Sequence, residues 1–185
     1  TAFEMLSSYG DEGRVGGLFI FGSNVAVSAP DARRIQQRLR KLDLLVVSDF
    51  FLSETAALAD VVLPAAQWAE EDGTMTNLEG RVVLRSRAFA PPTGVRTDLE
   101  AIVAIAASLG RGDCFPSSSP REVFDELRLA SSGGPADYKG ISYDRIRSRD
   151  GLFWPCPDLT HPGTPRLFIE QFPTPTGRAR FHAVH

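Results

Sequence analysis

Three short apolar runs constrain the fold of this chain more than any other feature. They lie at 18–21, 44–47 and 61–64, and each is long enough for a buried strand. A helical pattern at 30–42 separates the first two runs, and the helix-competent stretch at 53–59 separates the last two. Strands that alternate with helices build parallel sheets with right-handed crossovers. We therefore predict an α/β fold: a partial doubly wound parallel sheet, or Rossmann-like half domain, with a loop-rich C-terminal extension.

Composition narrows the class of protein. Apolar residues make up 43% of the 185 residues and charged residues 23%, values typical of a globular chain with a core. The net charge of −3 gives no reason to expect nucleic acid or an anionic membrane as a partner. No apolar run approaches the roughly 20 residues that span a bilayer. Cys114 and Cys156 are far apart, so we expect no disulfide framework and a reduced, cytoplasmic setting.

Two helix starts are visible in the second half of the chain. Thr97 and Glu100 have the spacing of a capping box, and Gly110 suits the residue after the helix end. Ser119 followed by Pro120 repeats the start signal. Weaker patterns predict short helices at 2–9 and 142–149, a strand within 81–86, and the beginning of a strand at 178–184.

Polar residues follow the predicted strands at the edge where open parallel sheets bind ligands. Asn24 and Ser28 come after the first strand, in either a plain strand-to-helix turn or half of a phosphate loop. Ser48 and Asp49 end the second strand. Asp49 can accept hydrogen bonds from ribose hydroxyls or a guanine edge, or it can cap the following turn. Asp98 is either a helix N-terminal acid or a further contact to the same nucleotide.

The sequence gives no reason to predict a catalytic or metal-ligating residue. The acidic run at 70–72 is more typical of a solvated loop than of a metal site. Cys156 stands between two prolines without a histidine partner, which favours a structural role. The three histidines show no ligand spacing, and no nucleophile elbow is present. The residues alone therefore indicate a nucleotide-binding α/β fragment.

A long motif resembles a known family. The blocks are DFFLSET at 49–55, ADVVLP at 59–64 and WAEEDGTMTNLEGR at 68–81, with RTD at 96–98 after them. Together they resemble the prokaryotic molybdopterin oxidoreductases, the dimethyl-sulfoxide-reductase family. The endings FWPCP, HPGTPRLF and TGRARF are most similar to the assimilatory nitrate reductase large subunit, and formate dehydrogenases have related endings.

The resemblance implies a cofactor and a division into parts. It implies that Asn24, Ser28, Ser48, Asp49 and Asp98 contact the dinucleotide of a bis-molybdopterin guanine dinucleotide that carries molybdenum. A [4Fe–4S] cluster and the molybdenum ligand would belong to other parts of a longer parent, since two distant cysteines cannot bind a four-cysteine cluster and neither matches the family's metal-ligand motif. We expect a nucleotide-binding half domain at 1–64 and an excursion onto the iron–sulfur-side domain at 65–94. Helices at 95–130 would return to the α/β domain, and 131–185 would connect to a C-terminal β-rich domain.

The resemblance also implies a reaction for the parent. We expect reduction of nitrate to nitrite in nitrate assimilation, with electrons from a reductase, ferredoxin or flavodoxin through the iron–sulfur cluster. The remainder of the parent polypeptide would be the main partner. A formate dehydrogenase of the same family is the first alternative. A non-catalytic nucleotide-binding or structural subunit is an alternative from another class.

Overall fold

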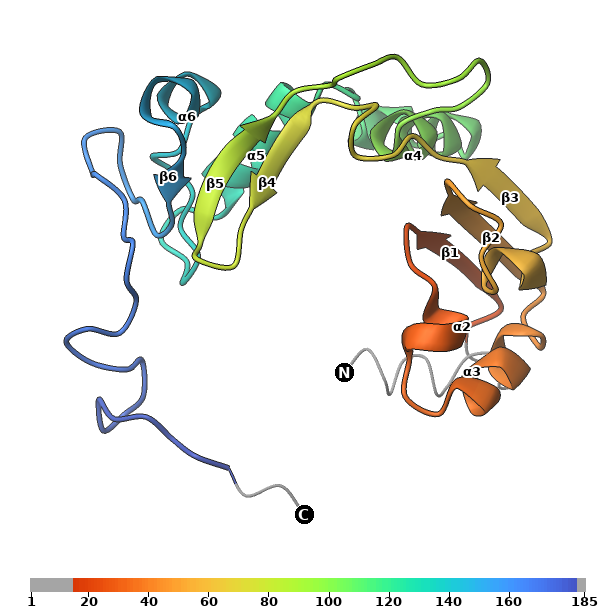
Figure 1. Cartoon of the computed structure of the whole chain (residues 1–185), viewed down its shortest axis with the longest axis horizontal. Coiled ribbons are helices and arrows are strands. Elements are labelled where there is room, and N and C mark those ends of the chain that lie inside the picture. The colour runs from red at the N-terminus through yellow and green to blue at the C-terminus, as the bar shows by residue number, and fades with distance from the viewer. Residues whose placement is uncertain (1–14, 183–185) are drawn as a thin grey trace. The chain divides into compact units, whose positions relative to one another are not determined.

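A computed structural model describes residues 15–182 of the chain, which form two compact units (Figure 1). Unit 1 contains the described residues up to Asp72 together with Ser86–Ser118. Unit 2 contains Gly73–Arg85 and the described residues from Ser119 onward. The helix expected at 2–9 lies outside the described residues. No helix of the described part is both long enough and apolar enough to cross a membrane.

The predicted parallel sheet is confirmed in unit 1. Strands β1 (Gly17–Phe21), β2 (Leu44–Asp49) and β3 (Val61–Pro64) are all parallel, in the order β1-β2-β3. The register pairs Ile20 with Val47 and Ser48 with Leu63. Because all three strands run the same way, their carboxyl ends lie along one edge.

One face of this sheet is closed by helix α3 (Ala32–Leu39), as Figure 1 shows below the strands. The helix is shorter than the predicted range of 30–42, because the Asp31 side chain caps it by accepting a hydrogen bond from the Arg34 amide. The short helix α2 (Val25–Ser28) was not predicted. The buried cluster between sheet and helices consists of Ile20, Ala26, Ile35, Leu39, Leu45, Val47 and Ala56.

The stretch between β2 and β3 forms only a 3₁₀ turn, η1 (Ala56–Leu58), rather than the longer helix that the sequence predicted. Its preceding residue, Thr55, has non-extended backbone angles and makes no capping bond with its side chain. The Thr55 hydroxyl instead accepts a hydrogen bond from the Ala26 amide, 29 positions earlier. This long-range bond withdraws the hydroxyl from the local role that would start a helix.

The other face of the sheet meets helix α4 (Asp98–Ser108). The predicted capping box is confirmed: the Thr97 amide donates to Glu100 Oε2 at 2.9 Å, and the Glu100 amide donates to Thr97 Oγ1 at 3.2 Å. Gly110 follows with φ +70°, where a side chain would be strained. An apolar groove with a cavity volume of ≈ 440 Å³ lies between α4 and the exposed side of Phe19 and Val61. Unit 1 therefore has one closed face and one partly open face.

Unit 2 is built on a small antiparallel sheet. Its strands are β4 (Gly73–Thr76), β5 (Arg81–Arg85) and β6 (Leu152–Phe153), in that order. Only β5 was predicted. Helices α5 (Pro120–Ala130) and α6 (Tyr143–Arg149) cover it, at the positions that the sequence indicated. The turn η2 (Gly112–Cys114) and an irregular chain complete the described part, and residues 178–182 form no strand.

The two units group α5 differently from the expected range of 95–130. Helix α4 belongs to unit 1, whereas α5 belongs to unit 2. The reason is visible in the core of unit 2, where Phe124 of α5 packs in one buried cluster with Val82, Ile146 and Leu152. How the ranges 1–64, 65–94, 95–130 and 131–185 map onto domains of a parent protein stays a prediction.

Candidate functional site

The carboxyl ends of β1, β2 and β3 are tied together by backbone hydrogen bonds. The Gly22 amide donates to the Ser48 carbonyl at 2.8 Å, and the Ala65 amide donates to the Asp49 carbonyl at 3.2 Å. The Ala66 amide then donates to the Arg96 carbonyl at 2.8 Å, just before α4 begins. We call this region the carboxyl edge: residues 22–28, 48–55, 64–66 and 96–98. All of it lies in unit 1.

Ser48 and Asp98 meet at the carboxyl edge, although 50 positions separate them in the sequence. Ser48 is buried, and its hydroxyl donates to Asp98 Oδ1 at 3.0 Å. The contact follows from the alternation of the strand: Val47 points towards α3, so Ser48 points to the opposite face, where α4 starts. Asp98 Oδ2 accepts no hydrogen bond from any described residue.

Asp49 closes the turn that follows β2. Its Oδ2 accepts a hydrogen bond from the Ser53 hydroxyl at 2.7 Å, and its Oδ1 accepts one from the Phe51 amide at 3.4 Å. The Ser53 hydroxyl oxygen in turn accepts from the Ala56 amide at 3.3 Å. Asp49 thus stabilises its own loop, and its half-buried carboxylate still lies at the edge.

Asn24 is held on both ends of its side-chain amide. Its Oδ1 accepts hydrogen bonds from the Thr55 amide at 3.1 Å and the Thr55 hydroxyl at 2.8 Å. Its Nδ2 donates to Glu54 Oε2 at 2.7 Å. Ser28 is exposed, and its hydroxyl donates to the Asn24 carbonyl at 3.0 Å. The protein thus engages the Asn24 side-chain oxygen and one of its two amide hydrogens.

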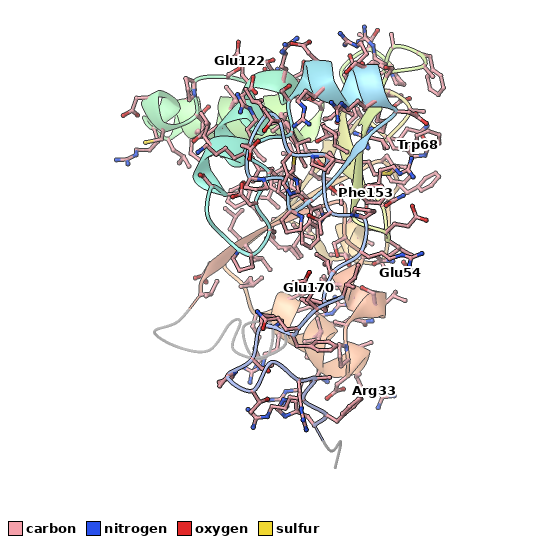
Figure 2. The ribbon with its side chains drawn as sticks, turned by 90° about the vertical axis from the view of Figure 1, so that its left-hand side faces the viewer. Arg33, Glu54, Trp68, Glu122, Phe153 and Glu170 are labelled. Atoms are coloured by element: carbon pink, nitrogen blue, oxygen red, sulfur yellow. The ribbon has the colours of Figure 1, made fainter. Side chains whose placement is uncertain are left out.

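Glu54 is the residue of this edge to which sequence reasoning gave no role. It is exposed, and Figure 2 labels it in unit 1. The hydrogen bond from Asn24, and secondarily one from its own backbone amide, lower the pKa of the Glu54 carboxyl below its ordinary value. The only signal in the sequence was its position in the loop that begins after β2, five residues past the strand end. The contact with Asn24, 30 positions away, could not be anticipated from that.

The chemistry of the edge is that of a hydrogen-bond acceptor. Three carboxylates, those of Asp49, Glu54 and Asp98, lie on its loops, and two of them keep an oxygen that accepts nothing from another described residue. Nowhere in residues 15–182 do three or more His, Cys, Asp or Glu side chains gather so that they could hold a metal ion. Carboxylates in this setting suit the N–H and O–H donors of a base or sugar.

The chain is similar to known oxidoreductases. The family model for molybdopterin oxidoreductase matches residues 4–108, more than half of the chain. The assimilatory nitrate reductase catalytic subunit of Bacillus subtilis is 46% identical over 184 residues, covering 100% of this chain and 26% of that protein. The F420-dependent formate dehydrogenase subunit alpha of Methanocaldococcus jannaschii is 45% identical over 167 residues, covering 90% of this chain and 24% of that protein.

A solved structure shows the same fold. Acetylene hydratase from Pelobacter acetylenicus matches with a TM-score of 0.61 and 21% identity, over 80% of this chain and 19% of the other. The chain thus spans about a quarter of the length of the curated relatives it matches. The parallel sheet, the motif from Asp49 to Arg81 and the family match agree. This chain belongs to the molybdopterin oxidoreductase family.

Proposed function

We propose that the carboxyl edge binds the guanosine end of a molybdopterin guanine dinucleotide, within a parent enzyme that reduces nitrate to nitrite. The observation that carries the proposal is the bond between Ser48 and Asp98, next to Asp49, where parallel strands end. In open parallel sheets this edge is the usual site for nucleotides. The roles of Asn24 and Ser28 at the dinucleotide belong to the same proposal.

The residues present fit the nucleoside part of the cofactor better than its phosphates. Asp49 and Asp98 are acceptors, and guanine and ribose present N–H and O–H donors. Ionised carboxylates repel phosphate groups, which prefer backbone amides and cations. We therefore assign Asp49 and Asp98 to guanosine, and Ser48 to holding Asp98 in place.

The cofactor would supply the oxygen-atom transfer, and this segment would bind and orient it. The remaining polypeptide would bind the second pterin and a [4Fe–4S] cluster, and it would supply the molybdenum ligand. Electrons would come from a reductase, ferredoxin or flavodoxin. We expect the isolated 185 residues to show no nitrate reduction.

Nitrate is favoured as substrate by the identity and coverage of the match to the Bacillus subtilis nitrate reductase subunit. A second nitrate reductase, from Haloferax mediterranei, is 42% identical over 169 residues. Formate oxidation is the second candidate, because the Methanocaldococcus jannaschii relative has nearly the same identity. Purified parent protein assayed with nitrate and with formate separates the two: nitrite formation supports the proposal, and formate-dependent reduction of an electron acceptor without nitrite formation overturns it.

The nucleotide role is tested by Asp49→Ala in the full-length parent protein. We expect a loss of bound cofactor of about tenfold, because each lost charge-assisted hydrogen bond contributes about 1.5–3 kcal/mol. The measurement is molybdenum content, together with the GMP released from the purified protein by acid. Asp113→Ala is the matched control, since Asp113 is exposed in unit 1 and remote in sequence from the edge. Equal molybdenum and GMP in the Asp49→Ala protein and the control would contradict the role of Asp49.

A further inference from the structure

We propose that Glu54 reads the guanine base, and that Asn24 and Thr55 hold its carboxylate in position. This inference rests on the proposed nucleotide function and deepens it. It gives a ligand role to a residue outside the set predicted from the sequence, and it moves Asn24 from ligand contact to positioning.

The first step is that Thr55 and Glu54 fix the orientation of the Asn24 side-chain amide. The side-chain oxygen of Asn24, Oδ1, accepts two hydrogen bonds from Thr55. One comes from the Thr55 amide and the other from the Thr55 hydroxyl. These two bonds fix which end of the Asn24 amide faces Glu54, because the oxygen must face the donors of Thr55. The Asn24 nitrogen is then directed at Glu54 Oε2, at 2.7 Å. A ligand that approaches Glu54 therefore meets a carboxylate whose Oε2 is already held by Asn24.

The second step is that Thr55 is a rigid anchor. It is fully buried, and its hydroxyl both donates to Asn24 and accepts from the Ala26 amide at 3.0 Å. The hydroxyl therefore joins the loop after β2 to the loop after β1. A buried hydroxyl that is satisfied both as donor and as acceptor is held in one arrangement, and it holds the Asn24 oxygen with it.

The third step is the state of the Glu54 carboxylate. It is exposed and ionised, since the pKa of this carboxyl is lowered by the hydrogen bond from Asn24. Oε1 accepts no hydrogen bond from another described residue. Asp49, by comparison, receives bonds on both of its oxygens. Glu54 is thus the better placed of the two to accept a hydrogen bond from a ligand.

The fourth step identifies the ligand group as a purine rather than a sugar. The same loop exposes Phe50 and Phe51, whose side chains are 53% and 72% accessible, with ring centroids 4.8 Å apart. Exposed aromatic rings beside a carboxylate offer a stacking surface together with an acceptor. Guanine presents N1–H and a 2-amino group as adjacent donors along one edge, whereas adenine has an acceptor at N1. A carboxylate therefore favours guanine over adenine.

The test uses the full-length parent protein, prepared without its cofactor in a host that makes no molybdopterin. The probes are GDP, IDP, which lacks the 2-amino group, and ADP, titrated by calorimetry. We expect the unmodified protein to bind GDP at least tenfold more tightly than IDP or ADP, because a site built to bond a donor rejects an analogue without it. Glu54→Gln should weaken GDP binding at least fivefold and remove the preference over IDP. Glu126→Gln, at an exposed position of α5, is the control that should match the unmodified protein.

Thr55 provides the test of positioning. Thr55→Val removes the hydroxyl and should lower the GDP-to-IDP preference as Glu54→Gln does, whereas Thr55→Ser keeps the hydroxyl and should restore it. Thermal unfolding of each variant separates a loss of fold from a loss of preference. A Thr55→Val protein that remains folded and still prefers GDP tenfold would overturn the positioning role.

The outcomes separate this inference from the proposed function. If the parent binds no GDP and releases no GMP when purified with its cofactor, the nucleotide function itself fails. If it binds GDP but Glu54→Gln binds equally well, or if GDP and IDP bind alike, only the inference fails. Where free GDP binds too weakly to titrate, GMP released from cofactor-loaded protein decides: a fivefold lower content in Glu54→Gln supports the inference, and equal content overturns it.

Discussion

The carboxyl edge of unit 1 and the loop around Arg145 of unit 2 both contain charged side chains, but these charges have different hydrogen-bond partners. In unit 2 the Arg145 guanidinium donates to the carbonyl oxygens of Gly140, Asp158 and His161. It also contacts the sulfur of the fully buried Cys156 at 3.4 Å. In unit 1 the carboxylates of Asp49, Glu54 and Asp98 each receive a hydrogen bond from another side chain.

Two carboxylates of unit 2, those of Asp137 and Asp158, are bound largely by backbone amides. Asp137 accepts hydrogen bonds from the Gly133 and Lys139 amides at 2.7 and 2.8 Å, which lower the pKa of its carboxyl. Asp158 accepts three bonds, from the hydroxyl and amide of Thr160 and the amide of His161. A charge bound by several backbone groups is part of the fold. A charge bound by one side-chain donor keeps acceptor capacity for a ligand, as at Glu54 and Asp98.

The largest effect is expected from Arg145→Met, which should loosen unit 2 and leave the carboxyl edge intact. Three carbonyl groups would lose their donor, and leaving such groups unsatisfied costs about 3 kcal/mol in total. Hydrogen exchange followed by mass spectrometry on the parent protein should show roughly a hundredfold faster exchange in 137–163, with 44–64 unchanged. Arg147→Met, on the same helix and exposed, is the control. Faster exchange in both segments would break the comparison between the units.

A smaller effect, visible as a pH dependence, is expected from Asp137→Asn. Because the folded pKa of this carboxyl lies below its ordinary value of 3.8, its stabilising contribution is fully present above that value. The contribution is lost as the pH falls through the folded pKa. Exchange in 131–141 should therefore accelerate in the unmodified protein below about pH 4. The Asn variant should exchange faster already at pH 7 and respond less to acid; an acid response equal to that of the unmodified protein would rule out Asp137 as the source.

The smallest effect on stability is expected at the carboxyl edge, from Ser48→Ala. One net hydrogen bond, to Asp98, would be lost, at a cost of about 1 kcal/mol. The GMP content of the purified parent should fall about threefold, because Asp98 loses the group that holds it. Ser108→Ala, which removes a hydroxyl bonded only to its own helix, is the control and should retain full content. Loss of stability without loss of GMP would class Ser48 with the structural groups of unit 2.

Local signals in the sequence predicted the elements that are stabilised by residues close to them along the chain. The capping box at Thr97 and the helix start at Ser119 are formed by residues within three positions, and both were located correctly. The strands of unit 1 were found because each is a continuous apolar run. Strand β6 was missed because it has two residues and exists only by pairing with Arg81 and Val82, about 70 positions earlier.

In the candidate site, too, the features set by local sequence or topology could be predicted, and those set by long-range contacts could not. Parallel topology alone predicted that Ser48 and Asp49, at the end of a strand, lie at the ligand-binding edge of the sheet. The bond between Ser48 and Asp98 agrees with the expectation that Asp98 points back to that edge. The arrangement of Asn24, Glu54 and Thr55 could not be predicted, because it depends on which end of an amide faces which loop. Such choices are made by contacts 30 positions apart and leave no periodic pattern in the sequence.

The hairpin of β4 and β5 has a consequence for how the chain can be divided. The polypeptide leaves unit 1 after Asp72, returns at Ser86, and leaves again after Ser118. No single truncation can therefore yield either unit free of residues that belong to the other. A chain cut at 118 keeps Val82 but loses Phe124, Ile146 and Leu152, which bury it. Genetic dissection of this segment calls for replacing 73–85 by a short linker in unit 1, and for fusing 73–85 to 119–185 to obtain unit 2.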